Sequence, residues 1–265
     1  MPDITERKAT DVAIAKQFEG VKDTGWDEVE AEDLSIPFIR ILQSGSPQVK
    51  KSDGAYIKGA EEGDIYNTVQ NCIYKGDEGI AVIPCYYSRR YIEWVPRTKD
   101  GGGFVASYAK TDPIVKTTTK NEKGADILPN GNELVNTAHF FSLMLNPETG
   151  APEHVLITMS STGLKKGRTW NSMAHSKTYV NSEGRTEIQP LMAHLYTLTT
   201  VPESNASGAW FNWKIEHARP LNLAIAMEEG YFDMGVLFAK SVKADEVTPV
   251  DQPITTEDPA DNSVM

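Results

Sequence analysis

Seven short runs of β-branched and aromatic residues constrain the fold of this chain more than any other feature. They are residues 36–42, 71–75, 80–97, 139–146, 154–160, 195–201 and 210–218. Runs of this composition, separated by turn residues, are typical of β-strands. Turn-forming stretches at 76–79, 100–103, 146–150 and 204–208 lie between them and predict hairpin or loop connections. The pattern favours an antiparallel meander or barrel.

Two segments have helical character instead. The first has Ser160, Ser161 or Thr162 as its N-cap and continues over residues 164–177. The second covers residues 221–242. Each contains glycine, which weakens a helix locally. The sequence therefore predicts a mainly β protein with minor α, including a C-terminal helix.

The formal net charge of -11 is confined to the two ends of the chain. Residues 1–33 carry ten acidic and four basic side chains, and residues 244–265 carry six acidic and no basic ones. Segments of such composition bury too little apolar surface to offset the entropy of ordering. We expect an acidic, partly disordered segment over 1–33, a β-rich domain over 34–243 and a disordered acidic tail over 244–265.

Several classes of protein are not expected from this sequence. No apolar run reaches the roughly 18 residues of a spanning helix and the N-terminus lacks a signal pattern, which predicts a cytoplasmic protein. Cys72 and Cys85 lie in separate strand-like runs and the five histidines lack ligand spacing, so we expect no metal or other cofactor. No phosphate loop, dinucleotide fingerprint or nucleophile elbow is present, so we expect no enzyme.

The run from residue 86 to 97 combines aromatic rings with arginines. In a strand, one face would carry Tyr87, Arg89, Tyr91, Glu93 and Arg97, and the other would carry Tyr86, Arg90, Ile92 and Trp94. Aromatic rings stack on unpaired bases at about 1–3 kcal/mol per base, and guanidiniums neutralise phosphates. Alternatively, the rings belong to the core and the arginines pair with acids on neighbouring strands. Both interpretations stay open.

A second basic cluster lies on the first expected helix. Residues 164–177 contain four bases, one tryptophan and no acid. Helical spacing puts Lys166, Trp170, Met173 and Lys177 on one side, where the ring would lie beside the charges. The alternative is a solvated basic face with Trp170 and Met173 turned to the core. A third group, Trp210, Phe211, Trp213 and Lys214, is better explained as core, because large aromatics are ordinarily buried.

This layout resembles that of bacteriophage-type single-stranded DNA-binding proteins. Similar runs are IPFIRILQSGSPQVKK, GDIYNTV, RRYIEWVPR and GLKKGRTWNSM, within residues 34–240. The resemblance implies an OB-fold, here with insertions, and an acidic tail that competes with DNA and recruits replication proteins. This chain departs from the best-known tails because its last residues, Asp261 to Met265, contain no aromatic side chain.

Together these features predict sequence-independent binding of single-stranded DNA in phage replication or recombination, with a homodimer as an open possibility. The nucleic-acid-binding candidates are Tyr87, Arg89, Arg90, Tyr91, Trp94, Arg97, Lys165, Lys166, Arg168, Trp170 and Lys177. The main alternative is a protein-interaction module, such as a virion component or a host-factor inhibitor, because aromatics and arginine are also enriched at protein interfaces. A metal-dependent nuclease is a more distant alternative.

Overall fold

The computed structural model describes residues 35–96, 102–206 and 208–244, together with Gly25. The chain divides into two units, Met1–Leu34 and Ser35–Met265, and all elements given below belong to the second. The predicted acidic segment 1–33 and acidic tail 244–265 lie outside the described residues, except for Gly25 and Ala244. The candidate Arg97 also lies outside them.

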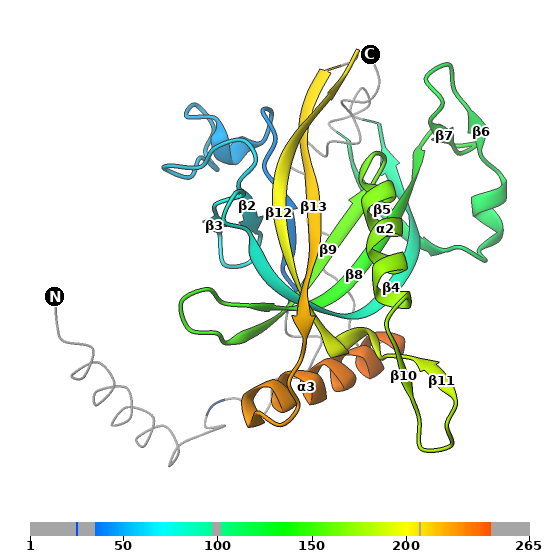
Figure 1. Cartoon of the computed structure of the whole chain (residues 1–265). Helices are drawn as coiled ribbons and strands as arrows, with labels where there is room; N and C mark the ends of the chain where they lie inside the picture. Colours follow the sequence, from blue (N-terminus) through cyan, green and yellow to red (C-terminus); the bar gives the residue numbers. More distant parts are fainter. Residues whose placement is uncertain (1–24, 26–34, 97–101, 207, 245–265) are drawn as a thin grey trace, which may run out of the picture. The chain divides into compact units, whose positions relative to one another are not determined.

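One large curled sheet forms most of the second unit (Figure 1). Its main strands are β1 (Phe38–Ile41), β2 (Ile65–Asn67), β3 (Cys72–Tyr74), β4 (Ile80–Val95), β8 (Glu133–Leu145), β9 (Pro152–Ser160), β12 (His194–Asn205) and β13 (Gly208–Pro220). Their order in the sheet is β13-β12-β4-β8-β9-β1-β2-β3. Neighbours are antiparallel except β1 and β9, which are parallel.

Shorter elements extend this sheet or project from it. β5 (Gly103–Ala109) pairs with β4, and the hairpin of β6 (Thr119–Lys120) and β7 (Asp126–Ile127) pairs with the first residue of β8. β10 (Thr178–Val180) and β11 (Thr186–Ile188) form a separate hairpin. The α-helices among the described residues are α2 (Gly163–His175) and α3 (Ala226–Lys243), with short 3-10 turns at Pro47–Val49, Pro113–Lys116 and Leu191–Ala193.

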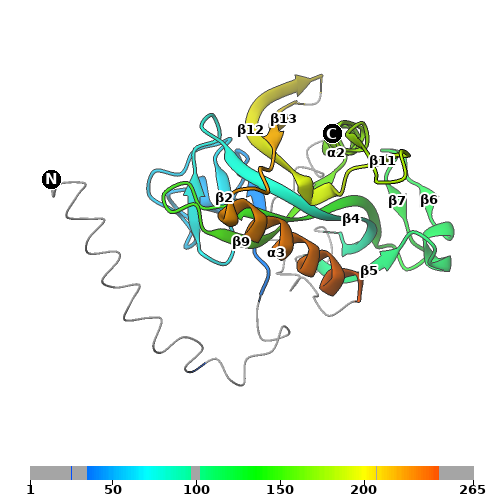
Figure 2. The same ribbon diagram turned by 60° about the horizontal axis from the view of Figure 1, so that its bottom comes forward.

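The two faces of the sheet are covered by two different helices. On the inner face, Val82, Phe140 and Ile157 pack with Trp170 of α2. On the outer face, side chains of β4, β8 and β9 pack with Tyr231, Phe238 and Val242 of α3, which crosses the sheet (Figure 2). β8 and β9 are therefore buried on both sides, which explains their nearly continuous apolar sequences.

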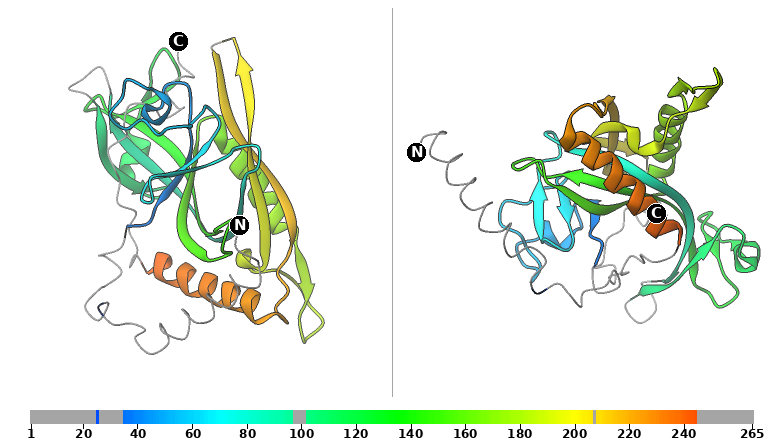
Figure 3. Two further views of the ribbon diagram at one scale, coloured as in Figure 1. Left: turned by 90° about the vertical axis from the view of Figure 1, so that its left-hand side faces the viewer. Right: turned by 90° about the horizontal axis from the view of Figure 1, so that it is seen from below.

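The curl of the sheet brings β12 and β13 close to the loops beside β1 and β3 (Figure 3). Thr200 donates its hydroxyl to the carbonyl of Gly63 at 2.6 Å and its amide to the carbonyl of Gly76 at 2.8 Å. Gly76 is required here, because a Cβ would lie 2.0 Å from the Gly63 oxygen. The side chain of Gln43 also bonds both the amide and the carbonyl of Phe211. These bonds partly close the sheet into a half-barrel.

The prediction of a mainly β protein with minor α and a C-terminal helix is confirmed. The second helix begins at Ala226 rather than Leu221. Residue 222 is instead held in a loop, where its amide donates to the carboxylate of Glu228 at 2.6 Å. Within the described part of the chain, no helix combines the length and apolarity needed to span a bilayer.

Candidate nucleic-acid interface

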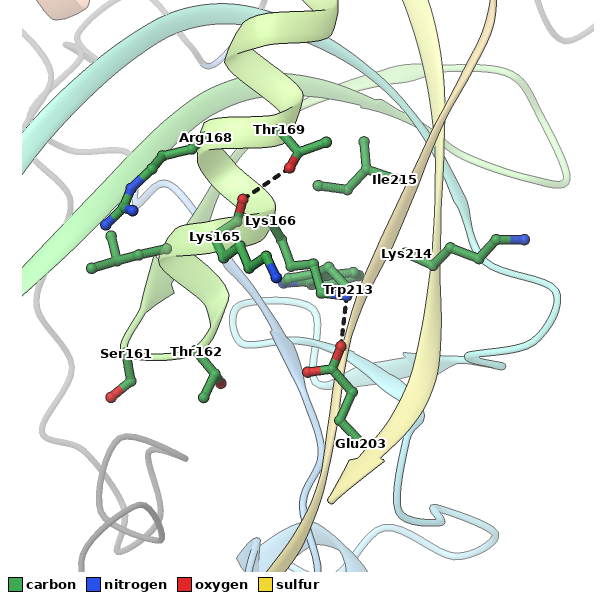
Figure 4. Close-up of a pocket in the computed structure, with 11 residues that line it drawn as sticks. Ser161, Thr162, Lys165, Lys166, Arg168, Thr169, Glu203, Trp213, Lys214 and Ile215 are labelled. Carbon is green, nitrogen blue, oxygen red and sulfur yellow. Dashed lines mark hydrogen bonds and ion pairs between the residues drawn. The ribbon is translucent and has the colours of Figure 1, made fainter. Parts of the chain in front are cut away.

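A pocket of about 660 Å³ lies between α2 and the β12–β13 ribbon (Figure 4). One wall comes from the start of α2 and the other from the facing strands. Its lining residues are Ser161, Thr162, Leu164, Lys165, Lys166, Arg168, Thr169, Glu203, Trp213, Lys214 and Ile215. The pocket therefore combines basic and hydroxyl side chains with an aromatic floor.

Basic side chains dominate the charge of this pocket. Lys165, Lys166, Arg168 and Lys214 line it against a single carboxylate, Glu203. The Nζ of Lys214 lies 2.9 Å from a carboxylate oxygen of Glu216, which is outside the lining. Lys165 and Arg168 are exposed and form no ion pair with another described residue. The N-terminus of α2 adds partial positive charge to the same region. This arrangement favours an anionic ligand.

The pocket already holds one internal ion pair. The Nζ of Lys166 lies 2.6 Å from Oε1 of Glu203, and each side chain is 30% exposed. Figure 4 shows Lys166 reaching from α2 to Glu203 past the ring of Trp213. Burial raises the pKa of Glu203, but hydrogen bonds from Lys166 and Asn212 outweigh it and lower this pKa overall. Glu203 is therefore ionised and neutralises Lys166.

Trp170 does not occupy the position expected for a base-stacking residue. Its side chain is 0% exposed, stacks on Phe140 at 4.3 Å between ring centroids, and meets Tyr196 edge-on at 5.6 Å. Gly163 and Gly167 share its side of α2 and are also buried, which lets the helix approach the sheet closely. The prediction that Trp170 stacks bases is thus corrected, because its ring belongs to the inner core.

The β4 candidates alternate between the two faces as predicted. Register with β8 pairs Tyr87 with Phe140 and Arg89 with Ala138, on the inner face, whereas Arg90 pairs with Thr137 on the other. The centroid of the Tyr87 ring lies 5.1 Å from that of Phe140. The Nε of Arg89 is buried and has no hydrogen-bond partner among the described residues.

The remaining β4 candidates are also half-buried. Tyr91 lies on the inner face with Arg89, and Trp94 packs edge-on against Phe104 at 5.6 Å. The charge of Arg90 adds to burial in lowering the pKa of His139 to about 4. None of these β4 side chains lines the α2–β13 pocket, so the structure does not bring all the predicted residues into one site.

Lys177 lies two residues beyond the end of α2 rather than on its basic face. Burial lowers the pKa of His194 and of His217, and the positive charge of Lys177 lowers both further. These two imidazoles contact each other through Nδ1 of His194 and Nε2 of His217 at 3.0 Å. Lys177 is therefore separated from Lys165 and Arg168 along the chain and lies outside the pocket lining.

Sequence reasoning missed the second wall of the pocket. Trp213 and Lys214 belong to the aromatic group that was expected in the core, and Trp213 is indeed only 4% exposed. The sequence did not single out Glu203 as a site residue, because an isolated acidic residue in a strand is ordinarily solvated. Side chains alternate between the two faces of a strand, so the sequence of residues 210–215 could have shown that Lys214 points away from the core when Trp213 points into it.

Comparison with known proteins gives one match. A family model described as Pam3 phage gp34-like protein matches residues 6–248. No curated protein and no solved structure matches the chain. Because the family match extends over most of the sequence and includes α2, α3 and the curled sheet of the described residues, the chain belongs to the Pam3 phage gp34-like protein family.

Proposed function

We propose that this protein binds single-stranded DNA without sequence preference and serves phage DNA replication or recombination. The observation that carries the proposal is the basic pocket between α2 and β13, which four basic side chains and one carboxylate line and where Lys165 and Arg168 form no ion pair with another described residue. Phosphates release counterions when they bind such side chains, so affinity would come mainly from charge. Membership of a phage family is consistent with this role.

The small size of the pocket, about 660 Å³, favours a flexible strand as the ligand. Duplex DNA is stiff over lengths far greater than this pocket, whereas a single strand bends to follow a groove. Lys165 and Arg168 would take phosphates, with the hydroxyls of Ser161 and Thr162 as further donors. The curled sheet would serve as an elaborated OB-type barrel that supports this groove.

The half-buried rings of β4 would supply base stacking. Tyr87, Tyr91 and Trp94 remain candidates, whereas Trp170 is withdrawn because it is fully buried. Arg89 lies on the same inner face as Tyr87 and Tyr91 and would extend phosphate contacts beside them, whereas Arg90 lies on the opposite face and would contact a strand only there. Binding would then involve a path longer than the pocket itself, with Lys166 available once Glu203 is displaced.

The acidic tail over 244–265 would regulate this surface. With six acids and no base, it would compete with DNA for the basic pocket and could recruit replication proteins. This part of the proposal rests on sequence, because the tail lies outside the described residues apart from Ala244.

Reversing two charges of the pocket tests whether this pocket binds the DNA. Lys165→Glu with Arg168→Glu should weaken binding of labelled oligo-dT at least about 30-fold at low salt, because two phosphate contacts become repulsive. The matched control is Lys51→Glu with Lys58→Glu, two exposed lysines that do not line the pocket. Equal loss in both double variants would mean that binding depends on overall charge, and the pocket assignment would fail.

A protein-interaction module is the second candidate function. Exposed apolar side chains on the β10–β11 hairpin favour it: Tyr179, Val180 and Ile188 are 42%, 67% and 48% exposed. Arg89→Glu with Lys166→Glu separates the two functions. A DNA-binding protein would lose its ligand, whereas a module that recognises a partner through apolar residues would retain that partner.

A further inference from the structure

Two polar atoms on the inner face of the sheet are buried and have no hydrogen-bond partner among the described residues. They are Nε of Arg89 on β4 and Oδ1 of Asn136 on β8. Arg89 also forms no ion pair with another described residue. A buried donor or acceptor without a partner destabilises a fold by about 1–3 kcal/mol, so native proteins seldom keep one without a reason.

These two side chains are neighbours on one face of the sheet. Register with β8 puts Arg89 opposite Ala138. The next pair on this face is Tyr91 opposite Asn136, so Arg89 and Asn136 are diagonal neighbours, within reach of a long side chain. The half-buried ring of Tyr91 lies beside both and contacts no other ring of the described residues. We call Arg89, Tyr91 and Asn136 the inner shelf.

The inner shelf lies beside the helix that lines the pocket. A Cβ added at Gly167 of α2 would lie 3.5 Å from the Cβ of Ala138, the residue opposite Arg89. Arg168 follows Gly167 and points away from the β13 wall of the pocket (Figure 4). The shelf is therefore only one strand away from the helix that supplies the unpaired cations of the pocket.

The acid on the same face of β4 does not neutralise Arg89. Glu93 lies four residues further along that face and is only 2% exposed. Its carboxylate accepts hydrogen bonds from the hydroxyl of Tyr108 at 2.6 Å and from Nδ2 of Asn130 at 2.8 Å. These bonds fix Glu93 within the fold, so the charge of Arg89 is left for a ligand.

The two unpartnered atoms restrict the chemistry of that ligand. Nε of Arg89 donates a hydrogen bond, whereas Oδ1 of Asn136 accepts one. A phosphate carries acceptors only, so it would satisfy Arg89 and leave the Asn136 oxygen without a donor. The Watson–Crick edge of an unpaired nucleobase carries both a donor and an acceptor, whichever of the four bases it is. In duplex DNA the complementary base occupies this edge.

We propose that the inner shelf binds one unpaired nucleobase, with Tyr91 stacked on its face and with Arg89 and Asn136 bonded to its edge. This inference rests on the proposed function and adds the group that distinguishes a single strand from a duplex. Arg89 has five N–H donors, so it can bond the base and still contact a phosphate. Because every base offers a donor and an acceptor, the shelf needs no preferred sequence.

Two labelled strands of equal length test the proposal on the full chain: oligo-dT, and an abasic strand that carries phosphates without bases. The parent protein should bind oligo-dT at least about 10-fold more tightly than the abasic strand. Asn136→Leu should weaken oligo-dT binding about 5-fold and leave abasic binding unchanged, because it alters no phosphate contact. Thr137→Val, at the next position of β8 and on its opposite face, is the control and should change neither affinity.

Urea denaturation separates a role in binding from a role in folding. Because Oδ1 of Asn136 has no partner among the described residues, Asn136→Leu should leave the denaturation midpoint unchanged or raise it. A lower midpoint, together with equally weakened binding of both strands, would assign Asn136 to the fold and overturn the proposal.

Two further results would overturn the inner shelf while leaving single-strand binding intact. One is equal binding of oligo-dT and the abasic strand by the parent protein. The other is an Asn136→Leu variant that keeps the full preference for oligo-dT. Failure of the parent protein to bind either strand would instead refute the proposed function, and the shelf with it.

Discussion

The Nζ of Lys166 on α2 lies 2.6 Å from Oε1 of Glu203 on β12, inside the pocket proposed to bind DNA. Glu203 also accepts a hydrogen bond from Nδ2 of Asn212 at 2.8 Å, which fixes its position. A phosphate that binds Lys166 must compete with this carboxylate. If the pocket binds DNA as proposed, Glu203 would therefore limit its affinity and make the bound strand easier to release.

Replacing Glu203 by Gln should tighten binding of oligo-dT roughly 3- to 10-fold, because the variant frees Lys166 and removes a repulsive charge. The dependence of affinity on salt should also become steeper, by about one further phosphate contact. Fluorescence anisotropy over a salt series measures both quantities. Glu183→Gln, on the exposed β10–β11 turn, is the charge-matched control. Unchanged or weaker binding by Glu203→Gln would contradict this role.

Trp170→Ala should destabilise the fold by about 3–5 kcal/mol, as expected when a buried tryptophan is truncated. Urea denaturation measures this loss. Trp170→Phe should cost less, because it keeps a ring against Phe140 and the indole nitrogen has no hydrogen-bond partner among the described residues. A Trp170→Ala variant of normal stability that failed to bind DNA would restore the stacking role that its burial argues against.

Stability should fall as the pH is lowered from 6.5 to about 4. Burial, helped by the charge of Arg90, lowers the pKa of His139 from 6.5 to about 4, so the fold favours the neutral imidazole. The stability that the neutral imidazole of His139 contributes is complete above pH 6.5. It is lost between pH 6.5 and about 4, because the unfolded chain binds the proton in this range and the folded chain does not. The loss from this residue alone is roughly 3 kcal/mol. Denaturation midpoints measured across this range test it.

The His139→Leu variant isolates this contribution. It should show a flatter dependence of stability on pH than the parent, while His175→Leu, at an exposed position on α2, should follow the parent curve. His154, His194 and His217 also have a pKa lowered by burial, so part of the acid sensitivity should persist in His139→Leu. Identical curves for the parent and His139→Leu would exclude the assignment.

Deleting residues 245–265 should tighten oligo-dT binding, most strongly at low salt, because it removes a segment that carries six acids and no base. Anisotropy on the full and shortened chains measures the change. A variant with these acids replaced by amides distinguishes charge from length. Affinity that stays the same or falls after deletion would rule out the tail as a competitor.

Much of the sheet could be predicted from local sequence. The seven apolar runs correspond to β1, β3, β4, β8, β9, β12 and β13. They could be recognised because the spacing of apolar residues and the positions of turn residues can be read from the local sequence. The strands β2, β5, β6, β7, β10 and β11 were missed. Most are only two or three residues long and depend on pairing with neighbours rather than on their own composition.

The site was harder to predict, for two physical reasons. Helical spacing grouped Lys166 with Trp170 but did not say which side faced the sheet. Gly163 and Gly167, seven and three residues before Trp170 and so on the same side of the helix, were the sign that this side is buried. The second reason is distance in sequence: Glu203 and Trp213 meet α2 only because the β12–β13 ribbon curls over it.

Single-strand binding is tested by measuring binding of the full chain to a labelled oligo-dT and to the matching duplex, at low and at moderate salt. We expect tight binding of the single strand, weaker binding of the duplex, and a steep loss of affinity with salt. Absence of single-strand binding, even after residues 245–265 are removed, would contradict the proposed function and would favour the protein-interaction module.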